Sequence, residues 1–286
     1  MIYIVIPVFN RWHFTKPCLE SLLQQTYTDF KIIVVDHGST DGTSEFIEKE
    51  YPSVILVKGD ESMWWSAATN LGVNKALELS QSVADFVLTL NNDLTVKPDY
   101  LEHLLTVSHE NKKSVIGSVL VNSKDPKQVV FAGVSWNKWN AKYRSIIDLS
   151  QFYTIQKEHK SFDSDLLPGR GTLIPITAFK IVGLYDTENF PHYAGDEEFS
   201  NRCKKAGYSI LISTRALVYG EIDATGLKNI HVKRTFAYWK DLFTSQRSPV
   251  NLKVRWKWAK KHTPLPPIYF IIDFSRIILS QLKKRS

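Results

Sequence analysis

The segment 86–94 is an apolar run that ends abruptly in three polar residues, Asn91, Asn92 and Asp93. Such a run predicts a buried strand that carries Asp93 at its C-terminal end. In open α/β sheets, ligands bind at that edge. Asn-Asn-Asp is also ordinary turn chemistry, so this segment taken alone leaves a turn and a ligand site equally open.

Three earlier runs rich in β-branched residues, 2–6, 32–35 and 54–57, alternate with helical patterns that start near Trp12, Thr43 and Trp64. Strands separated by helices indicate right-handed parallel units. We therefore predict an α/β fold whose first half is a βαβαβαβ array, with a mostly parallel central sheet flanked by helices.

The chain has 286 residues, 43% of them hydrophobic, enough for one large α/β domain with an appendage or for two modest domains. Cys18 and Cys203 show no metal or redox spacing and suggest a reduced compartment. Met1 leads directly into a strand, so we expect no signal peptide. The apolar stretch 266–282 is interrupted by charges and is too short to span a bilayer.

The segment around Asp36 repeats the pattern of a carboxylate directly after a strand. Asp36 is placed to accept hydrogen bonds from a base or a ribose, and Gly38 and Gly42 allow close backbone approach. For Asp41, an Asx-turn at the start of the next helix is a sufficient explanation. The glycine spacing matches neither a dinucleotide fingerprint nor a P-loop, which disfavours both enzyme classes.

Four segments, 4–10, 34–43, 70–72 and 90–93, together resemble the opening of a family 2 glycosyltransferase. The resemblance covers roughly residues 2–226 and implies a GT-A fold, a nucleotide-sugar donor and inversion at the anomeric carbon. Asn91 at the first acid of the Asp-x-Asp element is typical of the rhamnosyltransferase-like branch. The nucleotide and donor residues that we predict are Pro7, Phe9, Asn10, Asp36, Gly38, Trp65, Asn70, Asn92 and Arg170.

Asp93 matches the last acid of the metal-binding element, so the resemblance implies bound Mg²⁺ or Mn²⁺. One carboxylate plus phosphate oxygens suffices for an ion that keeps several waters and neutralises the leaving diphosphate. The family commonly places a histidine ligand where this chain has Gly220. Glu221, Asp223 and His231 are possible replacements, and the third ligand stays unassigned.

Trp64 and Trp65 precede the helix that contains Asn70. Aromatic pairs at a helix start more often belong to the core or to a staple, and the alternative is that one indole forms a wall for the donor sugar. Arg170 lies between Gly169 and Gly171, where it is placed either to contact the diphosphate or to pair with a local acid.

The segment 195–202, Gly-Asp-Glu-Glu-Phe-Ser-Asn-Arg, resembles the acidic dyad and arginine-bearing helix of the family. Asp196 matches the general base, and Gly195 stands where the family has the first acid. A helix dipole would keep a base at this position ionised. Three acids are also what a first helical turn prefers, and Glu198 with Arg202 fits an i,i+4 ion pair. We predict Glu198 and Tyr193 on the acceptor side.

The C-terminal part differs in composition, because residues 228–286 hold 14 basic and 2 acidic residues within a net charge of +7. After the prolines at 264–267 a helical pattern begins, with a narrow polar stripe that includes Asp273 and Arg276 and a wide apolar arc. Such a helix suits an anionic membrane interface, but packing on the catalytic domain or in a homodimer would produce the same pattern. The basic and aromatic residues carry no nucleic-acid motif.

These observations predict a catalytic domain over residues 1–226 and a basic, aromatic-rich helical extension over 227–286. We expect a metal-dependent inverting glycosyltransferase of the hexosyltransferase type, peripheral at the cytoplasmic face of the membrane. Its donor would be dTDP-rhamnose or a UDP-sugar, and its acceptor a glycan, lipid-linked, in cell-surface polysaccharide synthesis. The alternative is a noncatalytic, membrane-associated scaffold that keeps the fold and binds only nucleotide.

Overall fold

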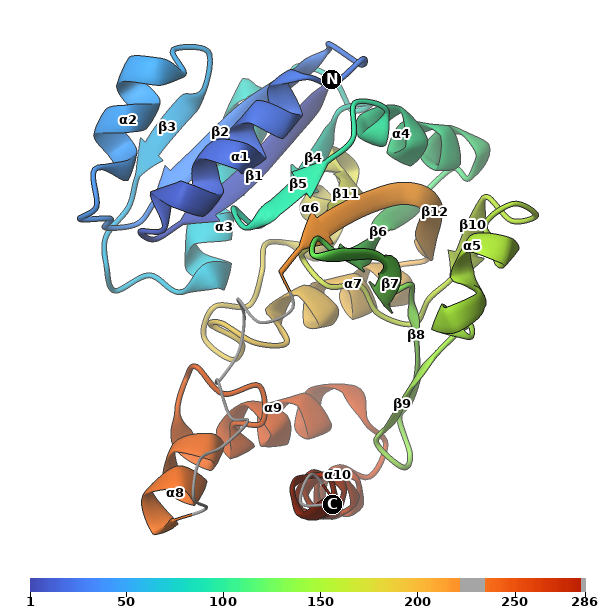
Figure 1. Cartoon of the computed structure of the whole chain (residues 1–286). Coiled ribbons are helices and arrows are strands. Elements are labelled where there is room, and N and C mark those ends of the chain that lie inside the picture. The colour runs from blue at the N-terminus through green and yellow to red at the C-terminus, as the bar shows by residue number, and fades with distance from the viewer. Residues whose placement is uncertain (222–234, 284–286) are drawn as a thin grey trace.

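A computed structural model describes residues 1–221 and 235–283. Its first part is the expected alternation of strands and helices (Figure 1), with strands β1–β4 parallel in the order β3-β2-β1-β4. The predicted βαβαβαβ array is therefore confirmed. Its elements are β1 (Ile2–Val8), α1 (Trp12–Leu23), β2 (Phe30–Asp36), α2 (Thr43–Glu50), β3 (Ile55–Lys58), α3 (Trp65–Leu79) and β4 (Phe86–Thr89).

The second part extends the same sheet beyond β4 in the order β11, β6, β12 and β10, with β5 paired to β12 and β7 paired to β6. Strand β11 runs antiparallel to both of its neighbours. The elements are β5 (Leu94–Val96), α4 (Tyr100–Glu110), β6 (Ser114–Asn122), β7 (Asp125–Phe131), β8 (Val134–Asn137), β9 (Lys142–Ser145), η1 (Leu149–Gln151), α5 (Phe152–Ile155), β10 (Ser161–Asp163), β11 (Thr172–Pro175), α6 (Ile176–Val182), α7 (Gly195–Lys205) and β12 (Ser209–Gly220).

Alternate residues of β1 divide the core between the two faces of the sheet. Ile4 and Ile6 pack with Leu19 of α1 and Leu104 of α4. The intervening Tyr3 and Val5 belong to a second cluster that holds residues of α3, α6 and α7. A strand covered on both faces needs apolar residues at every position, which explains the continuous run at 2–6.

The region after β6 is largely strand: 125–163 contains β7, β8, β9 and β10, because β7 returns to pair with β6 and β8 pairs with β9. The apolar runs 210–212 and 216–219 belong to the single strand β12, whose pairing with β6 is interrupted between Ile212 and Leu217. A bulge of this kind breaks the apolar alternation without ending the strand.

The described part of the C-terminal extension consists of α8 (Phe236–Thr244), α9 (Leu252–His262) and α10 (Pro266–Lys283), which lie below the sheet in Figure 1. Trp136 of β8 donates its indole N–H to the Tyr269 hydroxyl at 2.9 Å, and Lys261 forms an ion pair with Glu198 of α7 at 2.7 Å. The extension is thus packed against the α/β part. The predicted boundary at 226/227 lies outside the described residues, so the division into domains stays a prediction.

The polar stripe expected on the last helix does not all face solvent. Asp273 is buried and forms an ion pair with Arg255 of α9 at 2.7 Å, while Tyr269 and Ile277 are buried beside it. Among the residues of α10 whose burial is described, the exposed large apolar side chains are Ile268, Ile271 and Leu279. Among the described helices, none is long and apolar enough to cross a bilayer.

Candidate active site

The C-terminal ends of the central strands bring three predicted residues to one edge of the sheet. Pro7 and Asp36 lie near the ends of the paired strands β1 and β2, and Asp93 follows β4, which pairs with β1 on its other side. This is the edge at which ligands bind in open α/β sheets. Phe9 lies just beyond β1, exposed, with its ring stacked on His37 at a centroid distance of 5.3 Å.

The loop after β2 is held by its own side chains. Asp36 is buried, and its carboxylate accepts hydrogen bonds from the Ser39 N–H at 2.9 Å and from the Ser44 hydroxyl. Gly38 has φ +110°, and a Cβ there would lie 2.9 Å from the backbone N of Glu61, so a side chain is excluded. Asp41 bonds the Thr43 N–H at 3.2 Å, which confirms the expected Asx-turn.

The same loop fixes the chain between β1 and α1. The Asn10 carboxamide accepts a hydrogen bond from the Thr40 N–H at 2.8 Å, and Asp41 accepts one from the Trp12 N–H at 3.0 Å. Asn10 and Arg11 are consecutive left-handed residues, with φ 58° and 68°. Because non-glycine residues avoid this region, strain here points to a functional constraint.

Arg11 is a residue that our sequence reasoning missed. Its guanidinium lies 3.6 Å from the Asp93 carboxylate and 4.4 Å from the centre of the Phe14 ring. The only available signal was a cation directly after Asn10 at a strand end. Arg11 gives the Asp93 carboxylate a positive partner, so a metal ion at Asp93 would have to compete with it or displace it.

A chain of contacts joins the residues after β4 to the start of α7. The Trp65 indole N–H donates to the Asn91 carboxamide at 3.1 Å. A Cβ on Gly169 would lie 2.3 Å from the same indole ring, so only glycine fits there. The Gly169 N–H in turn donates to the Asp196 carboxylate at 2.6 Å. Residues from α3, β4, the 168–171 loop and α7 therefore form one contiguous site.

Asp196 begins α7 with one carboxylate oxygen on Gly169 and the other on the Glu197 N–H at 2.9 Å. Burial raises the pKa of Asp196, while the two amide N–H groups and the Arg170 guanidinium lower it. A carboxylate that is partly desolvated and held in place by backbone N–H groups has the properties of a general base.

Glu197 is a second carboxyl group at this position. Burial, and next to it the charge of Asp196, raises the pKa of Glu197 from 4.5 to about 7. Between these values the folded protein holds a proton that the unfolded chain has released. The contribution of Glu197 to stability is therefore full below pH 4.5 and is lost as the pH rises through 7.

Glu198 is fully buried and has no exposure to solvent. It accepts hydrogen bonds from Arg202 Nε at 2.8 and 3.0 Å, and Lys261 Nζ of α9 lies 2.7 Å away. The i,i+4 ion pair considered from the sequence is confirmed. Since a fully buried carboxylate does not face a substrate, we correct the acceptor-side prediction for Glu198 and assign it to the contact between α7 and α9.

Two amides predicted at the donor site hold the protein together instead. The Asn70 side chain both donates to the Tyr185 carbonyl and accepts from the Tyr185 N–H, each at 2.9 Å. The Asn92 amide donates to the Thr15 hydroxyl at 2.9 Å. Because these groups are used internally, we leave Asn70 and Asn92 out of the donor contacts proposed below.

Gly195 and Gly220 stand where the family has an acid and a histidine, and at both positions neighbouring atoms leave no room for a side chain. At Gly195, a Cβ would lie 2.5 Å from the Ser66 hydroxyl, so α7 and α3 approach too closely for a first acid. At Gly220, a Cβ would lie 2.7 Å from Leu94 Cδ2, on the strand beside Asp93. Glu221 is paired with Lys124 at 2.9 Å, and Asp223 and His231 lie outside the described residues.

No group of three His, Cys, Asp or Glu side chains within residues 1–221 and 235–283 is arranged to hold a metal ion. Asp93, whose side chain is only 8% exposed, is the carboxylate that we predict to bind a metal at the sheet edge. This donor set fits Mg²⁺ or Mn²⁺ when diphosphate oxygens and waters complete the shell, and it does not fit a metal bound by the protein alone.

Arg170 and Tyr193 flank the start of α7, and both are half-buried. Burial raises the pKa of Tyr193, and the nearby charge of Arg170 lowers it. Trp64 is half-buried against His192, with ring centres 5.4 Å apart. Trp65 packs on Tyr185 and also contacts Asn91, which favours the core alternative for the Trp64–Trp65 pair. The wall for the donor sugar stays a prediction.

The sequence and the structure both resemble known glycosyltransferases. The sequence profile described as glycosyl transferase family 2 matches residues 3–162. Glycosyltransferase GlyA of Streptococcus pneumoniae serotype 4 is 34% identical over 106 residues, which cover 36% of this chain and 14% of that protein.

Two solved structures each align with 96% of this chain at 15% identity. The crystal structure of GalNAc-T7 with UDP, GalNAc and Mn²⁺ aligns with a TM-score of 0.64 over 54% of its chain. The mannosyltransferase PcManGT from Pyrobaculum calidifontis, in complex with GDP-Man and Mn²⁺, aligns with 0.58 over 69%. The chain thus spans about half the length of the first of these structures and a smaller part of GlyA.

Proposed function

The chain belongs to glycosyl transferase family 2, and we propose that it transfers a sugar from a nucleotide-diphosphate sugar to a hydroxyl group of a glycan, with inversion at the anomeric carbon. The family and the GT-A fold expected from the sequence are both confirmed. The observation that carries the proposal is the contact chain from Asn91 through Trp65 and Gly169 to Asp196. It joins a donor edge to a carboxylate held as a base.

In the proposed reaction, Asp196 takes the proton of the acceptor hydroxyl as that oxygen attacks the anomeric carbon. The bond from that carbon to the diphosphate oxygen breaks, and the nucleoside diphosphate leaves from the opposite face. Bound Mg²⁺ or Mn²⁺ at Asp93 would neutralise charge on the leaving group. The charge of Arg170 lowers the pKa of Asp196 and would help to keep this base ionised.

We propose that Pro7, Phe9 and Asp36 line the pocket for the base and ribose of the nucleotide. Because Gly38 has no side chain, the backbone of its loop can approach the nucleotide closely. Asn10 holds the loop that closes the pocket. The donor class is dTDP-rhamnose or a UDP-sugar. Asn91, the rhamnosyltransferase-like feature, supports dTDP-rhamnose, and the structural neighbour GalNAc-T7, which holds UDP, GalNAc and Mn²⁺, supports a UDP-sugar.

The test is a screen of dTDP-, UDP- and GDP-sugars by thermal shift, followed by donor hydrolysis without acceptor. We expect one donor to raise the melting temperature with Mn²⁺ and to be hydrolysed slowly, and both effects to disappear with EDTA. Nucleotide binding without any hydrolysis or transfer, across a panel of acceptors, would favour the noncatalytic scaffold instead.

We further propose that α10 lies on the membrane surface that carries a lipid-linked acceptor, in cell-surface polysaccharide synthesis at the inner face of the membrane. Ile268, Ile271 and Leu279 lie close to one face of the helix at i, i+3 and i+11, and they are 52, 63 and 56% exposed. The surrounding chain is rich in Lys and Arg. Exposed apolar residues beside basic ones suit an anionic bilayer.

We expect Ile268→Glu combined with Ile271→Glu to weaken binding to vesicles of phosphatidylglycerol and phosphatidylcholine by about tenfold or more. Co-sedimentation measures this, and transfer to a short soluble acceptor should persist. Point substitutions test the exposed face alone, whereas removal of α10 would also break the ion pair between Asp273 and Arg255.

The matched control is Ile181→Glu on α6, an equally exposed isoleucine away from the extension. Should the double variant bind vesicles as the parent does, and instead turn a dimer into a monomer in analytical ultracentrifugation, the face would be a subunit interface.

A further inference from the structure

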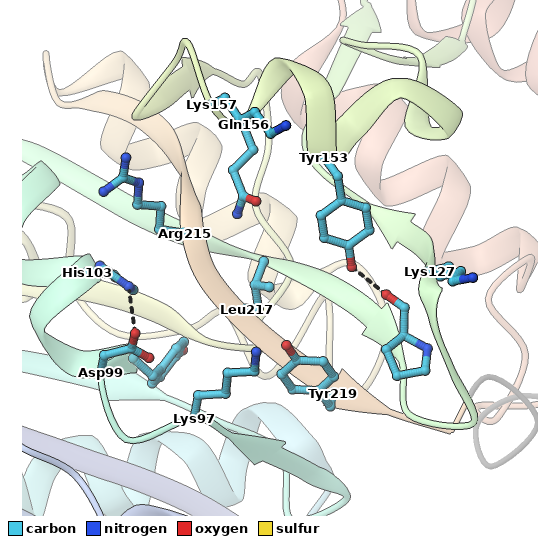
Figure 2. A pocket seen from close by; sticks show the side chains of 12 residues that line it. Lys97, Asp99, His103, Lys127, Tyr153, Gln156, Lys157, Arg215, Leu217 and Tyr219 are labelled. Carbon is cyan, nitrogen blue, oxygen red and sulfur yellow. Dashed lines mark hydrogen bonds and ion pairs between the residues drawn. The ribbon is translucent and has the colours of Figure 1, made fainter.

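A cavity lies where β12 passes between α4 and α5. Its volume is about 500 Å³, within the range of ligand pockets. Figure 2 shows Lys97 and Tyr219 on one side of it, Gln156 and Lys157 on the other, and Leu217 between them. None of the residues that we propose for catalysis or donor binding lines this cavity.

The cavity is rich in unpaired positive charge. Lys97, Lys127, Lys157 and Arg215 all line it, and none of them has a carboxylate within ion-pair distance in the part of the chain that the structure describes. The one acid of the lining, Asp99, is 3.1 Å from His103. The four cations repel one another, and one carboxylate does not balance their charge. A bound anion would reduce this repulsion.

Hydrogen bonds hold one wall of the cavity in place, because they fix the β12 bulge that carries Arg215. The Thr214 carbonyl accepts a bond from Gln156 at 2.5 Å, and the Thr214 N–H donates to the Lys160 carbonyl at 3.0 Å. On the other side, the Ser213 hydroxyl donates to the His103 carbonyl at 3.2 Å. The bulge therefore connects α4 to the segment after α5 and holds Arg215 between them.

Aromatic and apolar surface accompanies the charges. Tyr219 and Leu217 are half-buried in the wall, and Lys97 Nζ lies 5.9 Å from the centre of the Tyr219 ring. Tyrosine offers a flat apolar face with a polar tip. A sugar ring also has an apolar face and hydroxyl edges, so this lining matches a carbohydrate that carries negative charge.

The cavity is within reach of the proposed reaction centre. Its Lys97 follows β5, whose three residues lead directly from Asp93, and Tyr219 pairs with Thr95 of that strand. The four extended steps from Asp93 to Lys97 span about 13 Å, a distance that a short oligosaccharide bridges. We propose that this cavity binds an anionic, carboxylate- or phosphate-bearing sugar in a part of the acceptor glycan remote from the reacting hydroxyl.

The identity of the glycan as acceptor rests on the proposed function, but binding of an acidic sugar does not. Isothermal titration calorimetry of the full chain, without donor or metal, would compare trigalacturonic acid, maltotriose and inorganic phosphate. We expect trigalacturonic acid to bind at least tenfold more tightly than maltotriose or phosphate. Its affinity should fall as salt rises.

The pocket variant combines Lys127→Gln, Lys157→Gln and Arg215→Gln, and the control combines Lys31→Gln, Lys112→Gln and Lys180→Gln. All six side chains are exposed, so both variants should fold, and both lose three charges. We expect the pocket variant to bind trigalacturonic acid at least tenfold more weakly and the control to stay within twofold. An equal loss in both, or no binding by the parent, overturns the proposal.

Two further results would also overturn it. If phosphate bound as tightly as trigalacturonic acid, the cavity would be a small-anion site only. If the pocket variant lost vesicle binding tenfold, its occupant would be a lipid headgroup, although α10 lies at the far end of the molecule from α4 (Figure 1). Donor hydrolysis separates the proposals, since binding of trigalacturonic acid without hydrolysis would refute only the transferase.

Discussion

Replacing Asp196 by Asn should lower kcat by about 10²–10⁴, the usual contribution of a positioned general base. Affinity for the nucleotide sugar should stay within a few-fold, because Asn keeps the size of the side chain and its carbonyl oxygen still accepts the Gly169 N–H. Steady-state kinetics with the donor found by the screen, and donor titration in parallel, measure both quantities.

Glu197→Gln is the matched control for this result. With a pKa of about 7, Glu197 is half-protonated near neutrality, and Gln imitates its protonated form. We expect its kcat within a few-fold of the parent at pH 6.5. Loss of donor affinity at unchanged kcat in Asp196→Asn would remove Asp196 from the catalytic role, and a silent Asp196→Asn would show that the register assigned to the dyad is wrong.

Asp93→Asn should abolish detectable transfer and weaken Mg²⁺- or Mn²⁺-dependent nucleotide binding on the order of 10²-fold, while the fold survives. The reason is that Asp93 is the carboxylate that we propose to bind the metal at this edge of the sheet. Calorimetric titration of nucleotide with and without Mn²⁺ isolates the metal-dependent part of the affinity.

Asp163→Asn, an exposed carboxylate on β10, controls for the general loss of one negative charge. It should leave both transfer and metal dependence unchanged. An Asp93→Asn variant that transferred sugar at the parent rate would make Asp93 a turn residue, paired with Arg11 for structural reasons only.

The central strands were predictable because burial on both faces imposes continuous apolar runs. The segments 2–6, 32–35 and 86–90 carry that signal, and all three became parallel neighbours. β8 and β9 carry no such signal, because their hairpin packs through single residues such as Trp136 on the extension. The Tyr269 hydroxyl that Trp136 contacts lies 133 residues further along the chain.

The candidate site, too, could be predicted only in part. Asp36, Asp93 and Asp196 were identified from strand ends, a helix start and the family resemblance. The contact between Gly169 and Asp196 was not, because 27 residues separate them and neither sequence context indicates the other. The burial of Glu198 was also inaccessible, since its neutralising partner Lys261 comes from the compositionally distinct extension.

The ion pair between Glu198 and Lys261 makes the extension a poor candidate for modular exchange. Lys261 also bonds Asp186 at 2.7 Å, so one α9 side chain serves two acids of the α/β part. Removing Lys261 would leave the fully buried Glu198 with Arg202 as its remaining cation and would take the cation from Asp186 as well. A chimaera that grafts the helical segment of a relative onto this chain would therefore have to carry the matching cation with it. In evolution, too, the helices of the extension can diversify only along surfaces that leave this junction intact.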